Sequence, residues 1–153
     1  MQKRINPGLA ALAGAILFSI AAISFASLGN DPRFSTVTGD GTISISISTL
    51  RSGEARFYRY HGRNGASVKF IVARDETGCI QVAIDACEQC ATYREGYSTC
   101  DGYVVCRFCG NRYKINSLSG GAGSCVPFRL RYTLHGDAVQ ISSAELNKWS
   151  QLF

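Results

Sequence analysis

The chain has 153 residues, seven cysteines and a formal net charge of +5. Its basic residues are scattered along the sequence, and no run of them is dense enough to predict binding to nucleic acid. The sequence also lacks a Ser-His-Asp set, a phosphate-cradling glycine loop and paired catalytic carboxylates, so a stand-alone enzyme has little support.

Residues 1–28 are predicted to be a signal peptide or a transmembrane anchor. Lys3 and Arg4 precede a run from Leu9 to Ala26 that is apolar or small throughout and carries no charge. Small residues before a cleavage point after Ala26 fit a secretory signal, whereas a run of about 20 apolar residues is also long enough to span a bilayer. Because the positive residues stay inside, either interpretation places the rest of the chain outside the bacterial inner membrane, anchored there or released into the periplasm.

Residues 29–41 are polar, contain Pro32 and glycines, and are predicted to form a linker to one domain over 42–153. Short stretches in this domain alternate between apolar and polar residues, which is typical of β-strands. The predicted strands cover 42–50, 56–60, 68–72, 80–84, 103–105, 111–115, 127–133 and 138–141. Residues 94–102 are polar and turn-rich. The pattern predicts an all-β domain.

One helix is predicted at the C-terminal end, after the last strand. Ser142 and Glu145 have the spacing of a capping box. Leu146, Trp149 and Leu152 fall on one helical face, which we expect to pack into the core.

Two Cys-x-x-Cys pairs carry the chemistry that the sequence suggests. Cys87 and Cys90 form the first pair, and Cys106 and Cys109, followed by Gly110, form the second. Two residues between thiols let both sulfurs face one side of a turn, and we expect Gly110 to remove a Cβ that would block this approach. Four such thiolates suit zinc or iron–sulfur chemistry. From spacing alone, a structural zinc ribbon fits best, with two disulfides as an alternative.

The residues around the second pair resemble the second half of a Rieske domain. The resemblance covers 105–115, a glycine-rich loop, and 127–130. The chain departs from that pattern because no histidine stands at a ligand position. If four cysteines hold a [2Fe–2S] cluster here, its potential should fall towards that of ferredoxins.

A closer resemblance is to the FtrD-like family of membrane iron–sulfur proteins. It is carried by the cysteine motifs and by the strands that lead to the end of the chain, over 43–50, 56–60, 68–72, 82–90, 105–115, 123–127 and 141–153. The resemblance implies a membrane-attached protein with an iron–sulfur cluster, [2Fe–2S] being favoured, that transfers electrons in the uptake of iron or other metals. It also implies periplasmic redox or metal-binding partners, among them cupredoxin-like proteins, and a membrane permease.

Two alternatives to this interpretation stay open. One is a β module stapled by structural zinc that mediates protein–protein interaction. The other is a protein that binds copper or iron ions. The family pattern also includes Cys125, which implies a fifth ligand, a replacement ligand or half of a disulfide, and we expect it to support the centre from close by.

Cys79 and Cys100 lie in polar turns and fall where the family usually has other residues. A disulfide between them would close a loop of about 20 residues and stabilise the fold by roughly 3 kcal/mol. Two unrelated thiols are the alternative. His61 and His135 stand beside glycines and are expected at the surface. A peripheral copper or iron site is the alternative, and it requires the two histidines to converge.

Overall fold

A computed structural model of the protein describes residues 31–63, 65–118 and 125–153. The chain divides into a segment Met1–Pro32 and a folded unit Arg33–Phe153. The predicted signal peptide or anchor lies outside the described residues. Among those that are described, no helix is both long and apolar enough to cross a membrane.

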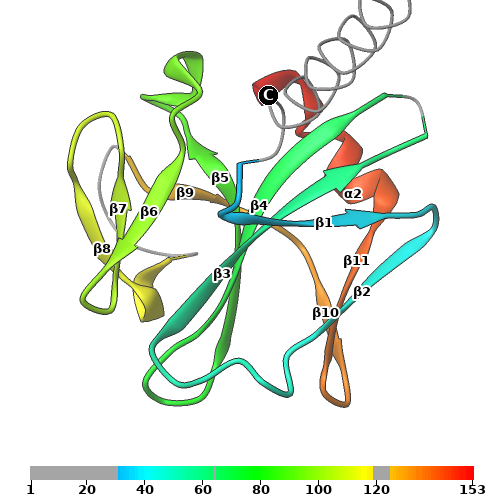
Figure 1. Ribbon diagram of the computed structural model, residues 1–153, viewed down its shortest axis with the longest axis horizontal. Helices are drawn as coiled ribbons and strands as arrows, with labels where there is room; N and C mark the ends of the chain where they lie inside the picture. The colour runs from blue at the N-terminus through cyan, green and yellow to red at the C-terminus, as the bar shows by residue number, and fades with distance from the viewer. Residues whose placement is uncertain (1–30, 64, 119–124) are drawn as a thin grey trace, which may run out of the picture. The chain divides into compact units, whose positions relative to one another are not determined.

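The centre of the folded unit is a five-stranded sheet with the strand order β1-β3-β4-β5-β9 (Figure 1). Its strands are β1 (Phe34–Thr38), β3 (Glu54–His61), β4 (Ser67–Arg74), β5 (Ile80–Cys87) and β9 (Pro127–Arg129). Neighbouring strands are antiparallel, except that β1 runs parallel to β3.

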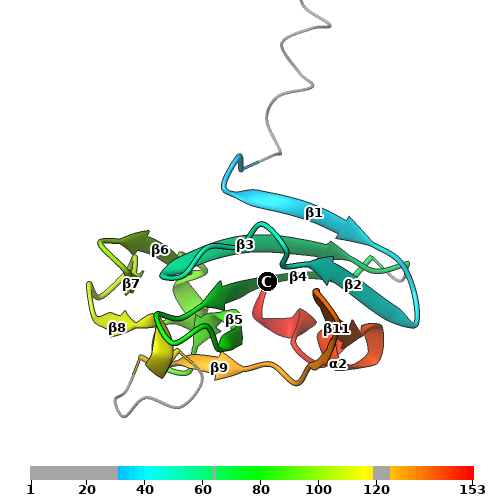
Figure 2. The same cartoon turned by 90° about the horizontal axis from the view of Figure 1, so that it is seen from below.

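Two smaller sheets accompany the central one, on the right and the left of Figure 1. The first has the order β10-β11-β2 and comprises β2 (Thr42–Ser46), β10 (Thr133–His135) and β11 (Ala138–Ser142). The second has the order β6-β7-β8 and comprises β6 (Tyr97–Cys100), β7 (Tyr103–Cys106) and β8 (Arg112–Lys114). Figure 2 shows the same arrangement turned by 90°.

Helical structure in the described residues is short. The α-helix α2 (Ser143–Asn147) follows β11, and three single turns of 3₁₀ helix occur at η1 (Ala91–Tyr93), η2 (Ile115–Ser117) and η3 (Ser150–Leu152). The predicted fold class, all-β with one short C-terminal helix, is therefore confirmed.

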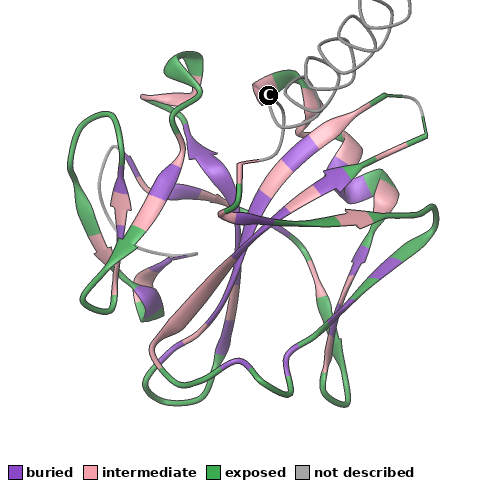
Figure 3. Ribbon diagram, in the orientation of Figure 1, coloured by how far each residue is buried: buried purple, intermediate pink, exposed green. Residues whose placement is uncertain are grey.

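Both faces of the central sheet are covered. Successive side chains of a strand point to opposite faces, so β5 contributes Val82 and Ile84 to one core and Ala83 and Cys87 to the other. The first core also contains residues of β2, β11 and α2, and the second contains residues of β6 and β7. This is why β4 and β5 are buried along most of their length (Figure 3).

The first core confirms the predicted apolar patterns at both ends of the domain. Ile43, Ile45 and Ile47 are buried in it. Leu146 is fully buried, and Trp149 and Leu152 pack against the same cluster. α2 begins as predicted, because the Ser142 hydroxyl accepts a hydrogen bond from the Glu145 N–H at 3.1 Å.

The structure differs from the predicted linker over 29–41, since β1 lies inside it. Phe34 is buried and meets the ring of Phe57 edge-on, with the ring centroids 5.9 Å apart. The Tyr60 hydroxyl donates a hydrogen bond to the Gly39 carbonyl at 3.1 Å. These partners stand about 20 residues further along the chain, so the polar composition of the segment concealed the strand. The strand β6, within the polar stretch 94–102, was missed for the same reason.

Candidate metal centre

Three separate parts of the chain bring five cysteines to one place. Cys87 ends β5, and Cys90 stands in the turn that follows. Cys106 ends β7, and Cys109 lies in the next turn. Cys125 comes two residues before β9, whose first residue pairs with Cys87.

The sulfur atoms are close enough to share a metal centre. The Sγ of Cys125 lies 3.5 Å from that of Cys90 and 3.3 Å from that of Cys109. Two groups of three sulfurs, each within 4.8 Å of one another, share Cys90. One group is Cys87, Cys90 and Cys125, and the other is Cys90, Cys106 and Cys109. The structure thus brings the four predicted ligands and Cys125 together, and their binding of a metal stays a prediction.

Backbone N–H groups of both turns point at the sulfurs. The Cys90 N–H donates to Cys87 Sγ at 3.3 Å. In the second turn, the N–H groups of Phe108 and Cys109 donate to the Cys106 sulfur, and that of Asn111 donates to the Cys109 sulfur. Such donors favour the thiolate form that a metal needs.

Gly110 has a different role from the one predicted. Apart from its chain neighbours, a Cβ at Gly110 would meet no atom of the described residues within 4 Å, so close approach to these residues is not what requires a glycine. Its φ of +76° is the requirement, because this conformation strains other residues. The turn that it forms lets its N–H donate to the Cys106 carbonyl at 2.9 Å.

The five thiols differ in exposure and in acidity. Cys87, Cys106 and Cys125 are buried, Cys90 is half-buried, and Cys109 is exposed. Burial raises the pKa of Cys90, Cys106 and Cys125. The N–H of Asn111, in contrast, lowers the pKa of Cys109 to about 7. Without a metal, Cys109 is therefore more readily a thiolate at neutral pH than Cys90, Cys106 or Cys125, and a cation that binds any of these three must displace a proton.

A buried series of contacts, which the sequence did not predict, fixes Cys125. The Tyr97 hydroxyl donates a hydrogen bond to the Cys125 carbonyl at 2.5 Å, and the Tyr97 N–H donates to the Asp85 carboxylate at 2.7 Å. Burial raises the pKa of Asp85 to about 7. A Cβ on Gly96 would lie 2.3 Å from Oδ2 of Asp85, so glycine is required there. The one sign of these contacts in the sequence was Asp85, a polar residue at the entry to the first cysteine turn.

A second tyrosine holds Cys125 from the other side. The Cys125 N–H donates a hydrogen bond to the hydroxyl of Tyr113, a residue of β8. Tyr113 lies within residues 105–115, which both family resemblances include, but neither resemblance indicated this contact. Both backbone groups of Cys125 are therefore engaged by tyrosines.

An exposed aromatic pair joins the two cysteine turns. Tyr93, in η1, and Phe108, between Cys106 and Cys109, stack with ring centroids 3.6 Å apart and an interplanar angle of 13°. Their exposed fractions are 55% and 49%. The pair places an apolar surface next to the thiols.

The remaining candidate residues lie apart from these groups. Cys79 and Cys100 are both exposed and unbonded, so their predicted disulfide stays a prediction. His61 and His135 are exposed, as expected, and neither belongs to a metal-capable group in the described part of the chain.

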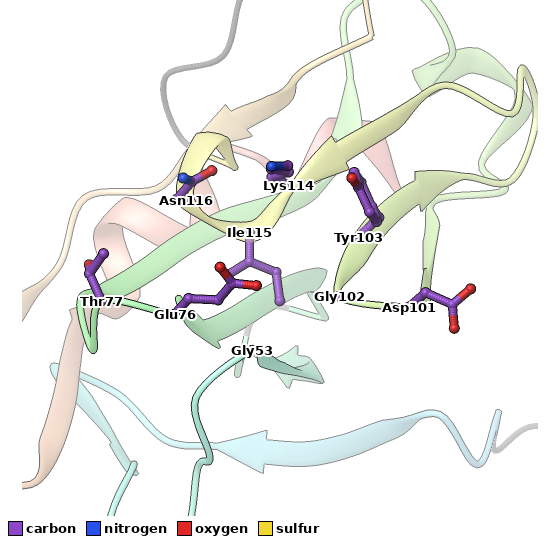
Figure 4. A pocket seen from close by; sticks show the side chains of 9 residues that line it. All are labelled: Gly53, Glu76, Thr77, Asp101, Gly102, Tyr103, Lys114, Ile115 and Asn116. Carbon is purple, nitrogen blue, oxygen red and sulfur yellow. The ribbon is translucent and has the colours of Figure 1, made fainter.

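A polar pocket of about 170 Å³ lies at the turn between β6 and β7, which is the end of β7 remote from Cys106 (Figure 4). Glu76 and Thr77 line it from the β4–β5 turn, and Asp101, Tyr103 and Lys114 from the β6–β8 sheet. Its acidic residues form no group with metal-ligand spacing among the described residues. The converging thiols are therefore the stronger candidate site.

A comparison with known protein families supports a metal centre at these cysteines. Residues 50–153 match the family described as membrane iron-sulfur containing protein FtrD-like. No curated protein and no solved structure matches the chain. The matched region covers more than half of the chain and includes all five converging cysteines. The chain therefore belongs to the FtrD-like family of membrane iron–sulfur containing proteins.

Proposed function

We propose that this protein is a membrane-associated iron–sulfur protein that faces the periplasm and transfers electrons in the uptake of iron or another metal. The observation that carries the proposal is the convergence of five sulfurs from three chain segments. The family assignment supports an iron–sulfur centre at the membrane.

The residues present fit an iron–sulfur cluster. Every donor is a cysteine sulfur, which is the ligand type that holds such clusters. The two Cys-x-x-Cys pairs suggest Cys87, Cys90, Cys106 and Cys109 as the four thiolates that would hold a [2Fe–2S] centre, which is the favoured type, and Cys125 lies beside them as a further donor. A bound cluster supplies one-electron chemistry, and the N–H groups aimed at the sulfurs tune its potential.

The position of the thiols supports exchange of electrons with a partner protein. Cys109 is exposed, and the Tyr93–Phe108 pair offers an apolar contact surface beside it. The partners that we propose are periplasmic redox or metal-binding proteins and a membrane permease, in line with the family resemblance.

The spacing of the sulfurs also favours a second candidate, a zinc-stapled interaction module. A Zn–S bond of about 2.3 Å places two sulfurs of a tetrahedral site roughly 3.8 Å apart. The distances of 3.5 Å and 3.3 Å from Cys125 are near this value. In this case the Tyr93–Phe108 surface would contact a partner, and the metal would only hold the two turns together.

Anaerobic purification followed by a redox titration separates the two candidates. The proposal predicts a coloured protein whose visible absorption bleaches on reduction with dithionite and returns on reoxidation. A colourless protein that contains one zinc and no labile sulfide would contradict electron transfer and support the zinc module.

A further inference from the structure

We propose that Cys125 is an inner ligand of the metal centre and that Cys109 is the outer, exchangeable thiol. This inference rests on the proposed function only in so far as the site binds a metal. It changes the ligand set that the two Cys-x-x-Cys pairs suggest.

The Cys125 sulfur contacts one sulfur of each cysteine turn. These are the sulfurs of Cys90 in the first turn, at 3.5 Å, and of Cys109 in the second turn, at 3.3 Å. It also belongs to one of the two groups of three sulfurs. Because the Cys125 side chain is only 4% exposed, its thiol is directed into this group and away from solvent.

The backbone of Cys125 is held more firmly than a spare thiol would require. Tyr97 binds its carbonyl and Tyr113 binds its N–H. Pro127, two residues on, pairs with Cys87 across β9 and β5. Cys79 and Cys100, in contrast, are exposed in turns. Two tyrosines and a strand pair thus preorganise Cys125 for ligation.

Five sulfurs exceed what one centre takes up. A tetrahedral ion has four positions, and an iron–sulfur cluster is held by four cysteines. One sulfur must therefore stay outside, and Cys109 is the exposed member of the five. We assign Cys87, Cys90, Cys106 and Cys125 as the inner set. Cys109 then exchanges with an inner ligand, as one metal–sulfur bond forms and another breaks, when metal enters or leaves.

Zinc titration of single variants tests this assignment, with Zn²⁺ alone as the probe. Cys125→Ser should weaken Zn²⁺ binding at least tenfold. Cys109→Ser should keep one zinc per chain and release it to a chelator at least tenfold more slowly. The matched control, Cys100→Ser, should resemble the wild type in both. Binding by Cys125→Ser equal to the wild type, or loss of zinc in Cys109→Ser, would overturn the assignment.

Alkylation of the wild-type protein provides a test that does not depend on the folding of a variant. In the zinc-loaded protein, iodoacetamide should label Cys79, Cys100 and Cys109, and mass spectrometry should find Cys125 unlabelled. After chelation, with the fold monitored by circular dichroism, labelling of Cys125 should accelerate at least tenfold. Labelled Cys125 beside protected Cys109 in the loaded protein would overturn the inference, as would a rate at Cys125 that chelation does not change.

Failure of the inference and failure of the proposed function are distinguishable. A protein isolated with zinc and without sulfide would end the electron-transfer proposal, whereas the two assays above decide the ligand set in either case.

Discussion

The two faces of the central sheet are covered by layers of different composition. On one face, β2, β11 and α2 pack aliphatic and aromatic side chains against β3, β4 and β5. On the other face, the β6–β7–β8 sheet packs a core that includes three buried thiols, Cys87, Cys106 and Cys125. Burial of apolar area stabilises the first layer without further help.

The second layer is smaller and depends on its sulfurs. Its strands have only three or four residues each. Burial raises the pKa of several of its thiols, so they stay protonated unless a metal replaces their protons. Local stability should therefore differ between the two layers, and the difference should depend on whether the metal is bound.

Removal of the metal should produce the largest effect. Structural zinc stabilises small domains by on the order of 10 kcal/mol. We therefore expect chelation to reduce the hydrogen-exchange protection of β6 and β7 by about 100-fold or more. The amides of β2 and β11 should keep their protection. An equal loss of protection in both layers would contradict the expected difference in local stability.

Substitution of Phe70 should produce the next largest effect, in the first layer. Phe70 is fully buried and stacks on Tyr58 with ring centroids 5.5 Å apart. Phe70→Ala should lower the free energy of unfolding by about 3–5 kcal/mol, measured by urea denaturation. The folded variant should bind as much metal as the wild type.

Leu134→Ala is the matched control, because this large apolar side chain is 54% exposed. It should change the free energy of unfolding by less than about 0.5 kcal/mol. A Phe70→Ala variant that folds well but has lost its metal would show that the two layers are not independent.

Gly96→Ala tests how tightly the second layer is packed, with Gly102→Ala as its matched control. Gly96 and Gly102 both have positive φ, but of the two only Gly96 would bring a Cβ against another side chain of the described residues, that of Asp85. Gly102→Ala should cost about 1 kcal/mol from backbone strain alone. Gly96→Ala should cost about 1–3 kcal/mol more and should weaken metal binding, since it displaces Asp85 and with it Tyr97. Equal unfolding free energies for the two variants would contradict this account of Gly96.

The smallest effect is expected at an ion pair near the start of β3. The Arg56 guanidinium, 2.7 Å from the Glu54 carboxylate, and the Arg51 N–H lower the pKa of Glu54 to about 2. The stabilisation is present above the ordinary pKa of about 4.5 and is lost as the pH falls towards 2. Because the pair is partly exposed, Glu54→Gln should cost no more than about 1 kcal/mol at pH 7. Urea denaturation between pH 2 and 7 should show that the free energy of unfolding depends less on pH in the variant than in the wild type. The same pH dependence in both would show that this ion pair does not contribute to stability.

Local patterns in the sequence predicted the strands well where one face of a strand met the core. Ile43, Ile45 and Ile47 show this, since their alternation alone places β2. The helix α2 was predicted from its cap at Ser142 and from Leu146. The cysteine pairs were predicted to converge because the spacing of a turn is a local property, and the structure brings them together.

What could not be predicted depends on contacts between distant residues. β1 exists because Phe34 packs on Phe57, and no pattern within residues 29–41 shows this. Cys125 is fixed by Tyr97, 28 residues away. The stacking of Tyr93 on Phe108 likewise depends on how two turns meet in space.

We propose that the second layer is built around an iron–sulfur centre held by cysteines. Iron and acid-labile sulfide per chain, measured in the anaerobically purified protein and in Cys106→Ser, test it most directly. We expect iron and sulfide in equal amounts in the wild type and a loss of at least nine tenths of both in the variant. A wild-type protein without sulfide, or a variant that retains the full amount of both, would contradict it.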